Sequence, residues 1–289
     1  MVNYVQITQL RTIGSNPAAE DSSSSMSQCY LQWRDKTLIV KQDRDLDSLD
    51  VVALKSDWWL VNCLQKSPIK RIHLTPSLGE EEVKKWAVAG EKTNKQMFLR
   101  LPSDRNLSLV QNTLAWKVKR TVDFTLALSL ILLLSPIGLA IALKQKLAGK
   151  AFLEKQWCIG RRGLIFKTFN WATGNYSGFW SRQGSKVGIN KLPQLINVLR
   201  GEMSLIGQYP FALGEAFCLN GGRRKVLNIA PGIVSITPWR SPQLDLRAIS
   251  SKSYVYLCHW SLLRDFKILL LILPRLLRNQ NSRHKTIKL

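Results

Sequence analysis

Acidic side chains are scarce in this chain and almost absent from its C-terminal part. The 289 residues include 19 Asp and Glu against 42 Lys and Arg. Residues 1–110 hold 13 of the acids and 15 of the bases, which leaves 6 acids, none with an acidic neighbour, and 27 bases in the remainder. That net charge of +21 predicts an anionic partner for the second part. Nucleic acid, acidic lipid headgroups and a phosphorylated substrate all carry the required charge.

Several other signals are also missing. The five cysteines are odd in number and far apart, without the short spacings of a zinc site or a disulfide framework, so we expect a reduced compartment. The N-terminus lacks the basic start and apolar core of a cleaved signal, which places the bulk of the chain in the cytoplasm. No helix-turn-helix, RNA-binding or finger pattern is present, so a nucleic-acid partner is not expected.

The first part of the chain alternates between strand and helix patterns. A polar stretch at 15–28, which includes Ser22 to Ser25, predicts a flexible loop, and 102–106 predicts a linker. Strands are expected at 37–40, 69–74 and 96–101, with helices at 58–64 and 80–91. The pattern predicts a small α/β domain over residues 1–110. Its strands carry no glycine-rich phosphate loop, which favours a structural or regulatory role over nucleotide binding.

One long apolar run predicts attachment to a membrane. No charged side chain lies between Phe124 and Leu143, and about 20 helical residues just cross a hydrocarbon core of ~30 Å. However, Pro136 removes a backbone donor, and basic residues flank both ends of the run. We therefore predict a re-entrant helix over 121–143, broken at Ser135-Pro136, with the Ser135 hydroxyl satisfying a freed carbonyl. A spanning helix and a buried core helix are the alternatives.

A second apolar stretch, Leu262 to Leu277, contains charged residues and is followed by a basic tail with Arg278, Arg283, Lys285 and Lys288. Such a segment is typical of interfacial helices, predicted here over 255–278. An ordinary docking helix with a basic tail is the alternative.

The order of the motifs in the second part resembles the bacterial sugar transferase family, the monotopic polyprenyl-phosphate phosphoglycosyl transferases. The resemblance covers about residues 117–278. It is carried by Lys119-Arg120, Asp123, Ser135-Pro136, Gly149, Phe152, Gln156, Gly160, Gly163, Leu192 to Leu195, Asn197 to Leu199, Gly201 to Gly207, Pro231 to Ile233, Trp260 to Leu262 and Asp265.

The resemblance implies the following fold and function. It implies an α-rich α+β membrane-associated transferase domain over residues 117–289, which would follow the α/β N-terminal domain that the strand and helix pattern predicts. The activity is transfer of a sugar 1-phosphate from a nucleotide diphosphate sugar to polyprenyl phosphate, at the cytoplasmic face of the plasma membrane, in exopolysaccharide biosynthesis. Membrane lipids and other polysaccharide-assembly proteins are further implied partners. Transferases of the cyanobacterial heterocyst envelope are similar in the same way.

The chain departs from the family at the catalytic pair. The family pattern has an Asp-Glu pair before Leu-Pro-Gln-Leu, in which the aspartate attacks the β-phosphate and the glutamate helps to hold Mg²⁺. Asn190 and Lys191 occupy these positions. An amide is a poor nucleophile and an ammonium repels a divalent ion, so Mg²⁺ is in doubt and no metal ligand is assigned. Asn190 is expected to cap the following helix.

Other residues are candidates for the remaining chemistry. Glu202, after the Gly201 expected to end a helix, and Glu215 are the best surviving acids, while Asp123 is expected to pair with Arg120. Candidate phosphate-binding or substrate-binding residues are Gln156, Arg161, Arg162 and Arg224. Lys191 could take over the metal's electrostatic role, with the lipid phosphate itself attacking. The alternative function is a catalytically silent relative that binds substrates or acts as a scaffold.

Overall fold

The computed structural model describes residues 29–34, 36–42, 57–102, 114–147, 149, 153–172, 189–235 and 245–277. The predicted loop at 15–28, most of the predicted linker and the basic tail from Arg278 onward lie outside these residues. Contacts divide the chain into two units, Met1–Arg100 and Leu101–Leu289. Each unit is described by itself below.

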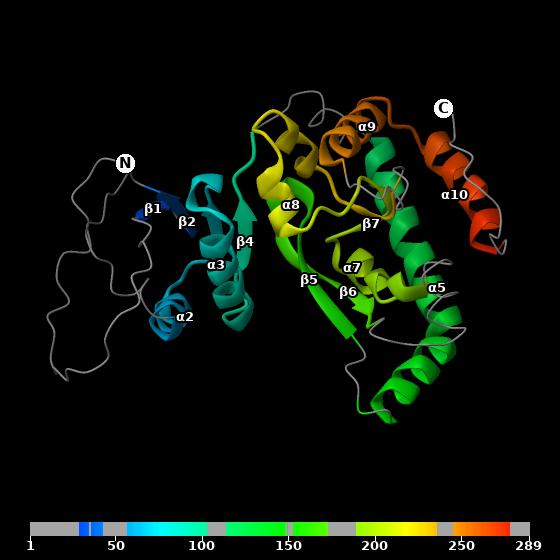
Figure 1. Ribbon diagram of the computed structural model, residues 1–289, viewed down its shortest axis with the longest axis horizontal. Helices are drawn as coiled ribbons and strands as arrows, with labels where there is room; N and C mark the ends of the chain where they lie inside the picture. The colour runs from blue at the N-terminus through cyan, green and yellow to red at the C-terminus, as the bar shows by residue number, and fades with distance from the viewer. Residues whose placement is uncertain are drawn as a thin grey trace, which may run out of the picture. The chain divides into compact units, whose positions relative to one another are not determined.

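The first unit is a four-stranded sheet with helices packed on one face (Figure 1). Its elements are β1 (Cys29–Arg34), β2 (Thr37–Gln42), α2 (Asp57–Lys66), β3 (Arg71–Leu74), a 3-10 turn (Pro76–Leu78), α3 (Glu80–Lys92) and β4 (Gln96–Leu99). The strand order is β1-β2-β3-β4, with β1 antiparallel to β2 and the other pairs parallel. The predicted helices and the three predicted strands are confirmed, whereas β1 was not predicted.

Strand alternation explains which face of this sheet is covered. Leu38 and Val40 of β2 are buried, as are Ile72 and Leu74 of β3 and both Met97 and Leu99 of β4. In a strand, every second side chain points to the same face, so these residues form one apolar layer. The buried side of α3, including Val83 and Trp86, completes the core.

The second unit begins with one long helix, α5 (Leu114–Leu147), and continues with a hairpin of β5 (Leu153–Ile159) and β6 (Ile165–Trp171). After a 3-10 turn η3 (Ile189–Lys191) come α7 (Gln194–Arg200), β7 (Ser204–Gly207), α8 (Leu213–Cys218), a 3-10 segment η4 (Arg223–Asn228) and β8 (Gly232–Ser235). Strands β7 and β8 are parallel. Helices α9 (Leu246–Cys258) and α10 (Leu262–Leu277) end the described chain.

Helix α5 continues through Ser135-Pro136 without an interruption of its helical structure. Pro136 cannot donate to the carbonyl of Leu132, four residues earlier, and the Ser135 hydroxyl donates to that oxygen at 2.9 Å. The predicted role of Ser135 is thus confirmed. The expected break at Ser135-Pro136 is not present, because α5 is helical on both sides of this step. Figure 1 shows that α5 changes direction in its C-terminal half.

Almost nothing covers the apolar part of α5. Only 6% of its most apolar 18-residue window is buried, and by length and composition the helix could cross a membrane. Leu132, Leu133 and Leu139 are each about 70% exposed. A core helix would be buried on most of its surface, so the buried-core alternative is excluded.

Both ends of α5 contact the same unit. Near its start, the Arg120 guanidinium donates to the backbone carbonyls of Val198 and Met203, each at 2.7 Å. Near its end, the Gln145 side chain donates to the carbonyl of Ala172, at the end of β6. The two contact regions are therefore parts of one folded body.

The predicted interfacial segment 255–278 falls on α9 and α10, which are separated by residues 259–261. On α10, Leu263, Phe266 and Leu270 are exposed, while Asp265 and Ile268 are buried. One side of this helix packs on the unit, and its apolar opposite side is uncovered.

Candidate functional site

Asn190 and Lys191, the residues at the position of the family's acidic pair, lie in the turn η3 just before α7. The prediction that Asn190 caps the following helix is wrong. Helix α7 begins only at Gln194, its N-cap is Pro193, and no side chain caps it. The turn at 189–191 and the Leu192-Pro193 step separate Asn190 from the first helical N–H groups, because a cap must directly precede the helix that it caps.

Lys191 is buried, with 8% of its surface exposed. Its turn packs against β6, and its charge interacts with that of Cys158 on β5. Burial lowers the pKa of Lys191 to about 7, because a charged ammonium loses its hydration. The amine is therefore divided between its charged and neutral forms near neutral pH.

Cys158 on the hairpin is a buried thiol that lies near enough to Lys191 to affect its pKa. The Sγ of Cys158 lies 3.7 Å from the hydroxyl oxygen of Thr168 on β6. Burial raises the pKa of Cys158 to about 12, the charge of Glu215 adds to this, and Lys191 opposes it. Such a thiol is inert as a nucleophile near neutral pH. Sequence reasoning did not single out Cys158, because only the fold brings it to Lys191.

Glu215 caps the start of α8. One of its carboxylate oxygens accepts from the backbone N–H of Ala212 at 2.9 Å, and the other accepts from the Tyr209 hydroxyl at 3.3 Å. Burial raises the pKa of Glu215, and these two hydrogen bonds oppose the shift. The pKa of Tyr209 is raised to about 12 by burial and by the adjacent carboxylate. Glu215 therefore has a structural role and also adds negative charge near Cys158.

Glu202 belongs to a buried polar cluster beyond the end of α7. Its carboxylate accepts from the side-chain amide of Asn197 at 2.6 Å, and the same amide donates to the Lys167 carbonyl at 2.8 Å. Asn197 is fully buried, and burial raises the pKa of Glu202. Gly201 ends α7 as predicted, with φ at 87°, a left-handed conformation that suits glycine.

The residues at this position do not fit the Mg²⁺ that the family resemblance implies. A divalent cation prefers several carboxylate or carbonyl oxygens. Among the residues that the structure describes, no group of three His, Cys, Asp or Glu side chains could hold a metal ion. Lys191 brings a positive charge to the position of the expected acid, and Glu202 is already bound by Asn197.

The predicted phosphate-binding residues are not gathered around Lys191. Gln156 is exposed on β5, and Arg162 is exposed in the short turn that follows this strand, Arg161–Gly163 (η2). The pKa of Arg161 is lowered mainly by burial and, to a smaller extent, by the positive charges of Arg162 and Arg120. Arg224 in η4 donates to the Phe217 carbonyl at 3.1 Å.

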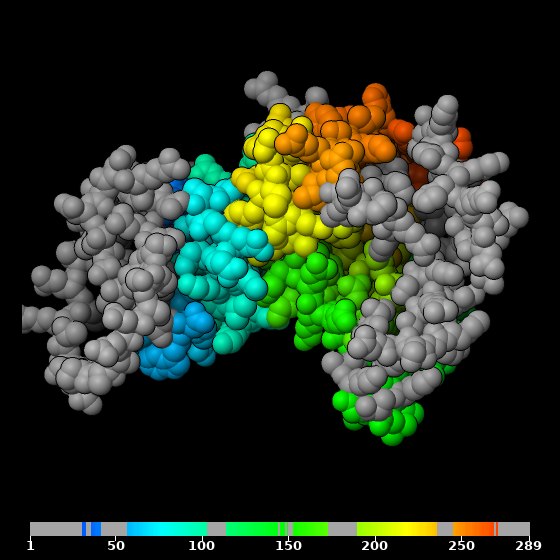
Figure 2. All heavy atoms as spheres, in the orientation of Figure 1, coloured from blue at the N-terminus to red at the C-terminus, as the bar shows by residue number. Residues whose placement is uncertain are grey.

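Turn η2 contacts η4, and α8 packs on β5. Figure 2 shows α8 and η4, in yellow, against the green hairpin.

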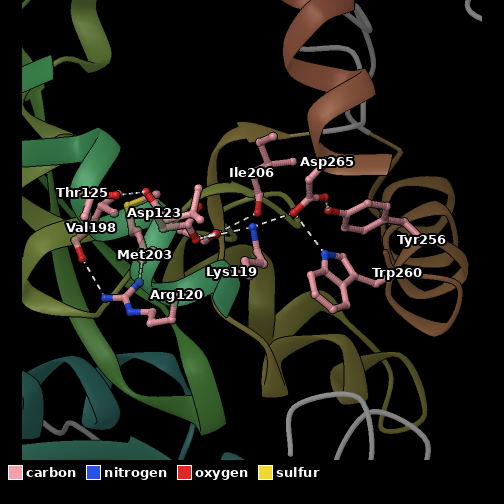
Figure 3. A network of polar contacts seen from close by, with 12 residues as sticks. Lys119, Arg120, Asp123, Thr125, Val198, Met203, Ile206, Tyr256, Trp260 and Asp265 are labelled. Atoms are coloured by element: carbon pink, nitrogen blue, oxygen red, sulfur yellow. Dashed lines mark hydrogen bonds and ion pairs between the residues drawn. The ribbon is translucent and has the colours of Figure 1, made fainter. Parts of the chain in front are cut away.

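A buried network of charges, which sequence reasoning missed, holds α5 against α9, α10 and β7 (Figure 3). The Lys119 ammonium lies 2.7 Å from the Asp265 carboxylate and 3.4 Å from that of Asp123. Asp265 also accepts from the Tyr256 hydroxyl and from the Trp260 indole N–H. The expected Asp123 to Arg120 pair is wrong: Asp123 pairs with Lys119, one turn earlier, because Arg120 points to the end of α7.

A cleft opens beside this network. Residues from α5, from η2 and from the segment between α7 and β8 line it, namely Trp116, Lys119, Arg120, Asp123, Arg161, Gly201, Ser204 and Ala230. It therefore lies where the apolar helix meets the rest of the unit. The described fold of this unit is a mixed α/β body that carries one apolar helix long enough to cross a membrane.

Comparison with known proteins gives the family. The model of the bacterial sugar transferase family matches residues 180–279. The uncharacterized sugar transferase EpsL of Bacillus subtilis is 30% identical over 193 residues, which cover 58% of this chain and 93% of EpsL. The chain therefore belongs to the bacterial sugar transferase family.

Two longer relatives have more specific names. The undecaprenyl-phosphate glucose phosphotransferase of Komagataeibacter xylinus is 28% identical over 245 residues, 73% of this chain and 44% of that protein. The UDP-glucose:undecaprenyl-phosphate glucose-1-phosphate transferase of Escherichia coli is 29% identical over 188 residues, 53% of this chain and 39% of that protein. The chain thus spans less than half of the length of these relatives.

Proposed function

We propose that this chain transfers a sugar 1-phosphate from a nucleotide diphosphate sugar to polyprenyl phosphate at the cytoplasmic face of the plasma membrane, in exopolysaccharide biosynthesis. The observation that carries the proposal is the joining of the candidate site to the apolar helix. Arg120 of α5 binds the carbonyls of Val198 and Met203 at the end of α7, the helix that follows Asn190 and Lys191. Such a site lies beside the lipid in which a polyprenyl substrate is dissolved.

The chemistry must proceed without the family's carboxylate nucleophile. In the proposed step, an oxygen of the polyprenyl phosphate attacks the β-phosphorus of the nucleotide diphosphate sugar. A new P–O bond forms there, the bond to the oxygen bridging the two phosphorus atoms breaks, and the nucleoside monophosphate leaves. Lys191, when protonated, would offset negative charge on the diphosphate. The fraction of Lys191 that is protonated falls as the pH rises through about 7.

The contacts of α5 support attachment to one side of the membrane. Arg120 and Gln145 are 25 residues apart, about 37 Å along a helix, and both contact the same folded body. A straight crossing would separate such residues by the ~30 Å hydrocarbon core. We therefore propose that α5 enters and leaves the bilayer on the cytoplasmic side, with its exposed leucines in lipid.

Labelling tests this topology. Single cysteines at Phe124 and Lys146 are expected to react with a membrane-impermeant maleimide from the cytoplasmic side only. The reaction is measured in inside-out and right-side-out vesicles, above the labelling of the natural chain. Reaction of the two positions from opposite faces would show that α5 spans the membrane and would remove this part of the proposal.

A catalytically silent protein, which binds substrates or acts as a scaffold for other polysaccharide-assembly proteins, is the second candidate. Asn190 and buried Lys191 in place of two acids favour it. A heterocyst-envelope role stays a prediction from the resemblance.

Transfer assays separate these two functions. The purified full chain is incubated with labelled nucleotide sugars and polyprenyl phosphate, with and without Mg²⁺. If the chain is an enzyme of the proposed kind, we expect lipid-linked label without a metal requirement, and at least a tenfold loss in Lys191→Ala, the order of one charge-assisted contact. Unchanged transfer in Lys191→Ala would exclude the electrostatic role of this residue.

The matched variant restores the family's pair. Transfer only by Asn190→Asp with Lys191→Glu, and only with Mg²⁺, would show that the natural chain is silent on an intact scaffold. Exposed Lys155→Ala on β5 serves as the control for a general loss of positive charge.

A further inference from the structure

Two arginines face the cleft beside α5, and their charges act on each other. Arg120 comes from the helix and Arg161 from the turn η2 after β5. Like charges brought together in a partly buried site repel, and a nearby negative charge reduces this repulsion. A group that brings negative charge to Arg120 and Arg161 would therefore be favoured in the cleft.

The protein's own carboxylates supply this negative charge to Arg120 alone, on which the charge of Asp123 acts from beyond ion-pair distance. Asp123, which lines the cleft, accepts from the Ser204 hydroxyl at 2.5 Å and lies 3.4 Å from Lys119. The nearby Asp265 is bound by Lys119, Tyr256 and Trp260. Within the described part of the chain, no carboxylate lies within 4.0 Å of either guanidinium.

The two guanidinium groups differ in how they are held. Arg120 is fixed by two backbone carbonyls, and Gly201 makes room for it, since a Cβ there would lie 3.1 Å from its Nη2 atom. The Nε of Arg161 is buried and has no hydrogen-bond partner among the described residues. A buried donor left without an acceptor costs on the order of 1–3 kcal/mol, so an acceptor is expected to bind there.

We propose that this cleft binds a phosphate group between Arg120 and Arg161. A phosphate offers several acceptor oxygens and suits the planar donor pattern of a guanidinium. Arg120 lies four residues before Phe124, where the apolar run begins, so the bound group sits at the level of lipid headgroups. The site is separate from the Lys191 position and does not require that the chain transfer any sugar phosphate.

Binding to the purified full chain in nanodiscs of neutral lipid tests the proposal. One arm titrates inorganic phosphate, and the other compares nanodiscs that contain a polyprenyl phosphate with nanodiscs that contain the corresponding polyprenol. The apparent Kd comes from the rise in melting temperature. No nucleotide sugar is present, so a failure here is distinct from a failure of transfer.

Arg161→Gln is expected to weaken binding roughly tenfold, the order of one charge-assisted contact. Arg162→Gln removes the same charge from the exposed neighbouring residue and is the matched control, with less than a twofold change expected. Arg161→Lys should keep part of the affinity. Binding only in the lipid arm identifies a lipid phosphate, and binding only in the other identifies a soluble phosphate.

Stability without ligand gives a second readout. Because Arg161 is repelled by Arg120 and Arg162, Arg161→Gln should leave the melting temperature of the ligand-free protein unchanged or raise it. A purely structural arginine would lower it. Absence of binding in both arms, or equal weakening by Arg161→Gln and Arg162→Gln, would overturn the proposal.

Discussion

Replacement of Asp265 by alanine is expected to destabilise the second unit by about 3–5 kcal/mol. Asp265 is 6% exposed, and its carboxylate accepts from Lys119, Tyr256 and Trp260. Its loss leaves the Lys119 ammonium buried with only Asp123, at 3.4 Å, as a counter-charge. It also leaves the buried Tyr256 hydroxyl and the half-buried Trp260 indole N–H without their acceptor.

Chemical denaturation of the purified chain in detergent measures this effect. Asp245→Ala is the matched control, because Asp245 is an exposed carboxylate that caps α9 by accepting from the N–H groups of Arg247 and Ala248. Loss of such a cap costs about 1 kcal/mol. If Asp265→Ala cost no more than Asp245→Ala, the buried network would not hold α10 against α5.

A double variant separates the cost of an orphaned charge from the worth of the pair. In Asp265→Ala with Lys119→Met, the buried ammonium is removed together with its counter-ion. We expect this double variant to be more stable than Asp265→Ala alone, because no uncompensated cation remains. The comparison is made in the same denaturation experiment.

The parts of the fold that the sequence predicted are those with a local pattern. Helix α3 presents its apolar residues at helical spacing, and β2, β3 and β4 alternate between buried and half-buried positions. Strand β1 was missed because its sequence, CYLQWR, mixes polar and apolar residues and follows a polar stretch. Its pairing with β2 decides its structure, and pairing partners are not visible in a short window.

The candidate site depended on contacts that no local pattern reveals. Lys119 and Asp265 are 146 residues apart, and only the packing of α10 on α5 brings them together. Cys158 likewise comes near enough to Lys191 to affect its pKa only through the packing of turn η3 against the hairpin. The spacing of four between Lys119 and Asp123 is the one signal that could have corrected the pairing predicted for Arg120.

The burial of Lys191 predicts a characteristic dependence of stability on pH. In the unfolded chain this lysine titrates near 10.5, and in the folded chain its pKa is about 7. Between these values the unfolded chain binds a proton that the folded chain lacks, so stability rises with pH by about 1.4 kcal/mol per pH unit. Above about pH 9, Cys158 opposes the trend, because its pKa is raised to about 12 and its folded form then binds the extra proton.

Lys191→Met should remove the rise between pH 7 and 9 and should stabilise the protein at pH 7 by a few kcal/mol, because the cost of burying an ammonium disappears. The free energy of unfolding is measured by denaturation at half-unit steps of pH. Lys155→Met, on the exposed part of β5, is the control and should keep the slope of the natural chain. A slope that persists in Lys191→Met would show that Lys191 keeps its proton in the folded state. The same loss of charge would weaken any contact of Lys191 with a diphosphate above pH 7, so stability and substrate affinity are expected to move in opposite directions with pH.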